Sequence, residues 1–506
     1  MNPAKRIIVN TSVQYAKAII TMALTLYSTR LVLDALSVSD YGIYMVIAGV
    51  VAMLGFITNA LAITTQRYLS YNQAQGDIAH LKKIFVNSLF IHLVFGLIVV
   101  AALLALQGIL FDRVLNIDPL RIPTAQKIYV ISAFMLLVTV LSSPYKALLI
   151  AHENIVYIAV VETVDAIVKL GMAISLAYIS FDKLLAYQWM IATIVTLNLL
   201  AFSAYSLFKF PESAVVIRFR DLDSSYIKKI TAFAGWTTYG MGCVAGRVQG
   251  TALVLNHFWG TAINAAYGIS NQIFAAISFL VGSILNAMNP QLMQAEGHGD
   301  RQKMLEMAVK QSKFTTAILA LVVIPLIAEI PTILDLWLKE VPEHTVMFCR
   351  MILLAFLADQ ITVGLGSACQ AIGQIRTFTL LTFTPKLLYM PVIWLMFRYG
   401  SSVYDAMVLY VLLEVAVALV RIPYMHYKAG LKVGAYCRRA IVPVVLQSAV
   451  IAAVCWLCVK GLHFHFRFFI TAACGVAAGL LSTWQFVLND EERTFSKVAL
   501  RKLTKR

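Results

Sequence analysis

Residues 154–179 read NIVYIAVVETVDAIVKLGMAISLAYI, a stretch that is largely apolar although it contains Glu162, Asp165 and Lys169. A helix needs roughly 20 apolar residues to cross about 30 Å of hydrocarbon. An ionised side chain at the bilayer centre costs about 2.5–3.5 kcal/mol, so these three groups must face protein or water rather than lipid. The stretch therefore predicts a membrane-spanning helix that carries a polar stripe.

The composition of the whole chain agrees with this prediction. Hydrophobic residues make up 60% of the 506 residues and charged residues 13%, whereas soluble proteins contain about one quarter charged residues. The chain is therefore predicted to be an all-α integral membrane protein with about fourteen transmembrane helices. We expect these helices at residues 8–33, 41–66, 83–107, 125–150, 155–179, 182–209, 228–256, 260–289, 304–330, 345–372, 377–398, 401–425, 440–459 and 466–488.

The net charge of +16 is not spread evenly along the chain. Lys and Arg gather in alternate loops and in the tail, at residues 5–6, 82–83, 218–229, 301–303, 428–439 and 493–506. Cytoplasmic loops of membrane proteins carry such an excess of basic residues. The pattern predicts that both termini are cytoplasmic, and it argues against nucleic acid as a partner.

An internal repeat divides the chain into two halves. TQRYLSYNQAQGD ends at Asp77 and MNPQLMQAEGHGD ends at Asp300, 223 residues later, and further weak matches share nearly the same shift. Repeats of this kind form two lobes around a central cavity that can open to either side of the membrane. With six helices in each half, we expect parallel repeats. The predicted domains are an N-terminal lobe (1–209), a cytoplasmic linker (210–229), a C-terminal lobe (230–426), an extra helix pair (427–488) and a basic tail (489–506).

Basic side chains recur inside the predicted spans of both halves. Lys386 lies 221 residues after Asp165, so charges occupy equivalent positions in the two halves. Arg and Lys along a path suit an anionic group such as a phosphate or pyrophosphate. The predicted substrate-binding residues are Lys17, Arg30, Lys169, Arg247 and Lys386. Arg67 and Arg421 lie near helix ends, where we expect them to snorkel to the membrane surface.

Acidic side chains accompany these bases. The predicted coupling or counter-charge residues are Asp34, Glu162, Asp165, Asp359 and Glu414. They could bind H⁺ or Na⁺ as the coupling ion, or they could balance the bases. A local alternative is an ion pair within one helix, as between Asp165 and Lys169 at a spacing of four residues. We expect no catalytic residue, no metal site and no resident cofactor.

Two classes of enzyme are disfavoured. The chain contains no G-x-x-x-x-G-K-[ST] motif, so a P-loop ATPase is excluded. A membrane glycan polymerase, ligase or glycosyltransferase needs a sizeable loop for its catalytic groups, and the longest loops here have about twenty residues. We therefore expect a protein that is not an enzyme.

Several segments resemble the polysaccharide flippases, of the O-antigen or Wzx type, in the MATE-like MOP exporter superfamily. The resemblance lies in DYGIYMVIAGVVAM (40–53), in the two repeat segments ending at Asp77 and Asp300, and in SACQAIGQIR (367–376). It implies a monomeric flippase of the bacterial inner membrane, which moves undecaprenyl-pyrophosphate-linked oligosaccharide by alternating access and is driven by an ion gradient.

The resemblance also implies that cavity cations hold the pyrophosphate and that membrane lipids and the polysaccharide polymerase machinery are partners. The alternative on the same fold is a multidrug or cation antiporter, which would require an acidic cavity.

Overall fold

The computed structural model describes residues 3–52, 54–73, 76–114, 117–214, 222–338, 341–462 and 466–494. Parts of the predicted linker and of the predicted basic tail, at 215–221 and 495–506, lie outside these residues. The described chain contains helices joined by turns and no strand, which confirms the predicted all-α class. Ten of its helices are long and apolar enough to cross a membrane, or eleven when one bent pair counts as a single span.

The difference from about fourteen spans has local causes. One predicted span, at 155–179, coincides with α5 (Ile155–Ser175), which is as apolar as its neighbours but is not among the ten because it contains three charged residues. The predicted break between residues 33 and 41 is wrong, because α1 (Pro3–Ala52) continues as one helix of 50 residues. The segment DALSVSD (34–40) contains neither Gly nor Pro, so only its polar residues suggested a loop.

The chain divides into two compact units, which are described separately. Unit 1 contains Met1–Met241 and Asn286–His298, and unit 2 contains Gly242–Leu285 and Gly299–Arg506. The division falls within α7 (Ser224–Gly297), which has a non-helical residue, Gly260, with φ of 81°. α7 therefore begins and ends in unit 1, while its middle belongs to unit 2.

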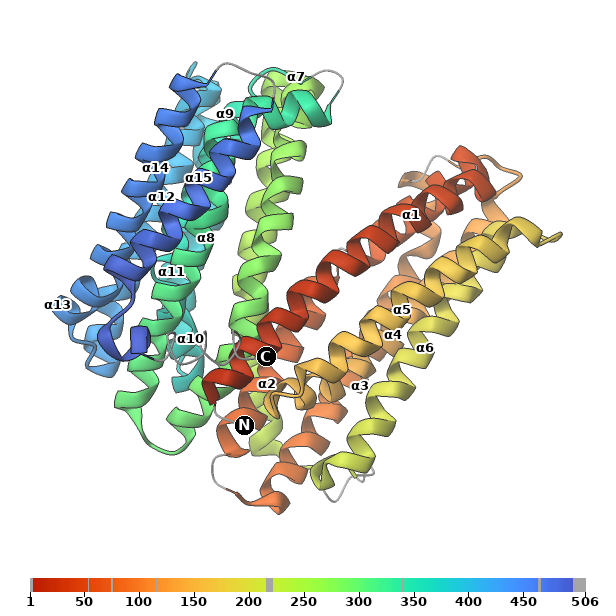
Figure 1. The fold of residues 1–506 in the computed structure, drawn as a ribbon. Coiled ribbons are helices and arrows are strands. Elements are labelled where there is room, and N and C mark those ends of the chain that lie inside the picture. The colour runs from red at the N-terminus through yellow and green to blue at the C-terminus, as the bar shows by residue number, and fades with distance from the viewer. Residues whose placement is uncertain are drawn as a thin grey trace, which may run out of the picture. The chain divides into compact units, whose positions relative to one another are not determined.

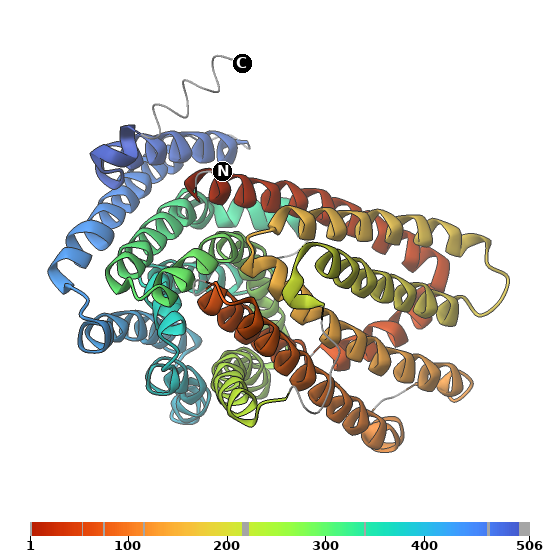
Figure 2. The same cartoon turned by 90° about the horizontal axis from the view of Figure 1, so that it is seen from below.

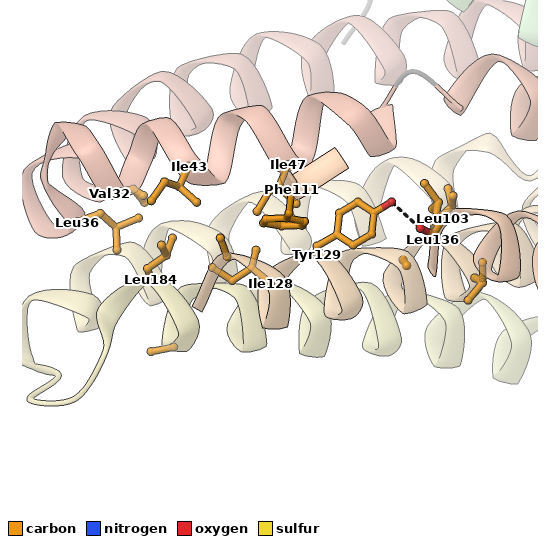
Figure 3. Close-up of a cluster of buried hydrophobic side chains, with 14 of the residues drawn as sticks. Val32, Leu36, Ile43, Ile47, Leu103, Phe111, Ile128, Tyr129, Leu136 and Leu184 are labelled. Carbon is orange, nitrogen blue, oxygen red and sulfur yellow. Dashed lines mark hydrogen bonds between the residues drawn. The ribbon is translucent and has the colours of Figure 1, made fainter. Parts of the chain in front are cut away.

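Unit 1 is a bundle of long helices (Figure 1). Besides α1 and α5 it contains α2 (Gly55–Gln73), α3 (Ile78–Ile109), α4 (Ile122–Ala151) and α6 (Lys183–Lys209). Figure 3 shows part of its core, in which Ile47 of α1 lies near Phe111, and Val32 of the same helix lies near Ile43. The Tyr129 hydroxyl donates a hydrogen bond to the Leu103 carbonyl at 2.8 Å, so this buried aromatic keeps a polar partner.

Unit 2 is also helical. Besides the middle of α7 it contains α8 (Arg301–Trp337), α9 (Thr345–Gln360), α10 (Val363–Ile372), α11 (Arg376–Arg398), α12 (Val403–Ala429), α13 (Val433–Tyr436), α14 (Val442–Gly461) and α15 (Arg467–Ser482). α9 and α10 form the bent pair, at 49°. A close approach of α10 to α8 requires glycine, because a Cβ at Gly364 would lie 2.0 Å from the Ala308 carbonyl oxygen.

The last two long helices pack on α8, side by side (Figures 1 and 2). Glu329 of α8 is buried and accepts hydrogen bonds from Arg467 Nε at 3.2 Å and Thr471 Oγ1 at 2.8 Å on α15. Lys313, also on α8, pairs with Glu492 at 2.6 Å. Ionic contacts at two positions along α8 therefore attach α15 and the segment that follows it to this helix.

Candidate functional site

A buried cluster of ionic side chains lies in unit 2, where α7, α9, α11 and α12 meet. α12 supplies two of its members, Glu414 and Arg421, which are seven residues apart and so lie on one face of the helix. α7 supplies Arg247, α9 supplies Asp359 near its bent end, and α11 supplies Lys386. We call these five residues the unit 2 cluster.

Each carboxylate of the unit 2 cluster contacts two bases. Glu414 forms ion pairs with Arg247 and, at 2.7 Å, with Lys386 Nζ. Asp359 Oδ1 lies 2.7 Å from Arg421 Nη2 and 3.6 Å from Lys386 Nζ. Lys386 therefore bridges two arginine–carboxylate pairs.

The charged side chains of the unit 2 cluster are buried, so each needs a partner of opposite charge. The side chains of Arg247, Lys386, Glu414 and Arg421 are 4–7% exposed. Three bases face two carboxylates, so the cluster carries one excess positive charge when all five are ionised. Buried ions are tolerated only when they are paired and hydrogen-bonded. The Nε atoms of both arginines find no acceptor among the described residues, so these groups retain unused donors.

A second ionic cluster lies in unit 1, around α5. Glu162 pairs with Lys17 of α1 at 2.5 Å and with Lys146 of α4. Asp165 pairs with Lys169 at 2.8 Å and accepts a hydrogen bond from Asn198 of α6 at 2.7 Å. We call Lys17, Lys146, Glu162, Asp165 and Lys169 the unit 1 cluster.

The predicted polar stripe of α5 therefore turns toward two sets of neighbours. Glu162 faces α1 and α4, whereas Asp165 faces α6. The local ion pair between Asp165 and Lys169 is present. The side chains of Lys146 and Lys169 are 41% and 40% exposed, so this cluster is more open than the unit 2 cluster.

The other predicted residues are placed differently. Arg30 and Asp34 of α1 have exposed side chains, and their roles remain predictions. Arg67 and Arg421 are each 6% exposed, so the prediction that they snorkel to the membrane surface is wrong. Arg67 instead stacks on the Tyr68 and Phe233 rings, 4.7 and 5.1 Å from their centroids.

The sequence analysis missed Lys146 and misassigned Arg421. A usable signal existed for Arg421, because its spacing from Glu414 places both on one helix face. No such signal exists for Lys146, because its partner Glu162 lies on another helix.

Comparison with known proteins establishes the fold class. No family model matches the chain, and no curated protein matches its sequence. Solved structures do match. A MATE protein in the straight conformation has a TM-score of 0.71 and 14% identity, and the match covers 86% of this chain and 97% of that one. A MOP superfamily transporter from Pyrococcus furiosus, described by a reversed polarity of its binding pocket, gives 0.72 and 13% with the same coverage.

An outward-facing multidrug resistance MATE family transporter of the MOP superfamily gives a TM-score of 0.71 and 13% identity, again covering 86% of this chain and 97% of that one. The chain therefore has the fold of MATE and MOP superfamily transporters, as the sequence resemblance predicted at the level of the superfamily. Together with its many apolar helices, this fold marks it as a multi-pass membrane protein.

Proposed function

We propose that this protein is a flippase that moves a lipid-linked oligosaccharide with an anionic pyrophosphate across the bacterial inner membrane. The observation that carries the proposal is the charge count of the two ionic clusters. In each of the two clusters three bases accompany two acids. An interior with excess positive charge favours an anionic group over an organic cation.

The geometry of the unit 2 cluster supports a phosphate ligand. Arg247 and Lys386 converge on the oxygens of one carboxylate, Glu414. Phosphate oxygens are acceptors of the same kind, and arginine offers them a planar set of donors. Glu414 thus occupies the position that a phosphate would take, and a pyrophosphate could replace it during transport.

The same contacts suggest a role for the acids. Glu414 and Asp359 each already have two basic partners. A Na⁺ ion would have to compete with these bases for the oxygens. We therefore assign Glu414 and Asp359 to counter-charge, and we propose that any coupling to H⁺ or Na⁺ uses other groups, such as the exposed Asp34.

A multidrug or cation antiporter is the second candidate. It is favoured by the similarity of fold to a multidrug resistance MATE family transporter. Against it stands the excess of bases in both clusters. The description of the Pyrococcus furiosus transporter links a reversed pocket polarity to a different function within the superfamily, which is the distinction drawn here.

Transport measurements in proteoliposomes would test the proposal. The two probes are a fluorescent polyprenyl-pyrophosphate oligosaccharide and the cation ethidium. Lys386→Met leaves two bases and two acids in the unit 2 cluster. We expect it to slow lipid flipping at least tenfold, because a factor of ten corresponds to about the free energy of one charge-assisted hydrogen bond. Arg398→Gln, at the exposed end of the same helix, is the matched control.

Two outcomes would overturn the proposal. One is transport of ethidium without flipping of the lipid probe. The other is a Lys386→Met variant that flips the lipid at the rate of the Arg398→Gln control. Lys386→Arg, which keeps the charge, should retain most of the rate.

A further inference from the structure

The last part of α7 belongs to a different unit from the residues on either side of it. Residues 242–285 of this helix belong to unit 2, the segment Asn286–His298 belongs to unit 1, and the chain returns to unit 2 at Gly299. Gly299 has φ of +76°, a left-handed conformation that suits glycine and allows the sharp return. A relative motion of the units must therefore bend α7 near residue 285 or detach this segment from unit 1.

Side-chain amides hold the segment Asn286–His298 in unit 1. Gln291 Nε2 donates to Glu153 Oε2 at 3.1 Å, in the turn between α4 and α5. Gln294 Nε2 donates to Gln73 Oε1 at 3.1 Å, at the end of α2, and to the Ala151 carbonyl at 3.4 Å. The two bonds of Gln294 join neutral groups and are of modest strength, whereas the bond of Gln291 to the Glu153 carboxylate is charge-assisted and therefore the stronger contact of the three.

Glu153 occupies a position that is unfavourable for glutamate. Its φ is +57°, in the left-handed region where a residue with a Cβ is strained. Its side chain is buried, at 9% exposure, although a buried carboxylate loses hydration. Glycine would relieve both costs. What glycine cannot supply is the side chain that reaches Gln291.

Neighbouring hydrogen bonds connect the α4–α5 turn, which contains Glu153, to the rest of unit 1. The Glu153 carbonyl accepts a hydrogen bond from Asn10 Nδ2 of α1 at 3.1 Å. Gln73 lies 2.8 Å from His152 Nδ1, and His152 Nε2 lies 2.5 Å from Glu212. The α4–α5 turn is thus held on several sides, so the end of α7 is the partner that we expect to move.

We propose that Asn286–His298 is a releasable latch, which Glu153 and Gln73 hold closed on unit 1 and which detaches when the transporter changes its access side. The distribution of basic residues predicts that this side is cytoplasmic, since the latch lies next to the start of α8, which carries Arg301 and Lys303. This proposal depends on the proposed function only because it requires alternating access. Its test needs no transported substrate.

Hydrogen exchange of the full-length protein in nanodiscs tests the latch. Glu153→Gly suits the positive φ but removes the side chain, and Gln291→Leu removes the donor at similar size. For both variants we expect the amides of 286–298 to exchange at least about fivefold faster. The internal reference is the start of α7, at 224–234, where Tyr226 contacts His80 at 3.1 Å and whose exchange should not change. Glu153→Gln keeps an acceptor and should retain protection within about twofold.

The exchange rates distinguish a releasable latch from a turn that has only a structural role. Unchanged protection of 286–298 in both Glu153→Gly and Gln291→Leu would overturn the proposal. Faster exchange across all of unit 1 would also overturn it, because it would indicate a general loss of stability. If the lipid probe is not flipped but the exchange pattern is as expected, the proposed cargo fails and the latch stands.

Discussion

Replacing Glu414 by glutamine should destabilise unit 2 strongly. The substitution keeps the size of the side chain but removes one of two negative charges that face three buried bases. The excess positive charge in the cluster rises from one to two. Arg247 loses the carboxylate with which it is paired, and Lys386 keeps only Asp359, at 3.6 Å.

The expected magnitude follows from the burial of these groups. Removing one partner of a buried ion pair typically costs about 3–5 kcal/mol. For units of roughly 150–250 residues, about 1 kcal/mol lowers Tm by roughly 2–4 °C, so we expect a fall of about 6 °C or more. Thermal unfolding of the purified protein in detergent, followed by intrinsic fluorescence, measures this shift.

The matched variant is Lys386→Met. It leaves Arg247 with Glu414 and Arg421 with Asp359, so the two remaining pairs are balanced. Replacing a buried charge by an apolar side chain in this way is often neutral or stabilising, and we expect Tm within about 2 °C of the wild type or above it. The double variant with Glu414→Gln restores one excess charge and should recover part of the loss.

Equal Tm values for Glu414→Gln and Lys386→Met would refute the reasoning. That result would mean that water, rather than the opposite charges, solvates the unit 2 cluster.

Three further predictions concern packing and pH. Gly364→Ala places a methyl group against a carbonyl oxygen of α8 and should cost about 1–3 kcal/mol in thermal unfolding, whereas Gly366→Ala, with its nearest atom 3.8 Å away, should change little. Glu329→Gln weakens the attachment of α15 to α8, and the loss of a charged hydrogen bond should cost about 1.5–3 kcal/mol and increase proteolysis of α15. Burial raises the pKa of Glu212, but the hydrogen bond with His152, a backbone hydrogen bond and the nearby charges of His152 and Lys82 together outweigh it and hold that pKa below its usual 4.5. This contribution is present above pH 4.5 and is lost as the pH falls through the lower folded-state pKa, so Glu212→Gln should flatten acid unfolding there.

Much of the fold could be predicted from the sequence, because the lipid bilayer imposes a simple rule on the residues that cross it. Apolar runs predicted the helices, and the repeat segments suggested two halves with a resemblance to MOP exporters. The predicted break within α1 was wrong because the polar residues at 34–40 include no Gly or Pro that would end a helix. The break between two predicted spans at Gly260 of α7 is a change of backbone conformation within one continuous run of helix.

The ionic residues were predicted better than their partners. Lys386, Glu414, Arg247 and Asp359 were recognised because a charge in an apolar helix is anomalous, whichever neighbour it meets. Their partners depend on which helices pack together, and sequence spacing fixes contacts only within one helix. The pair of Asp165 and Lys169 could therefore be foreseen.

The path of α7 has a consequence for how the protein could be divided. Two fragments separated at the linker, near residue 220, would not each contain a whole unit, because unit 1 also needs both ends of α7, up to Met241 and at Asn286–His298, from the second fragment. Such fragments should fold only when they are co-expressed, because the residues of unit 1 are divided between them. If the two halves arose by duplication of one ancestral gene, this interleaving would have kept them on a single polypeptide.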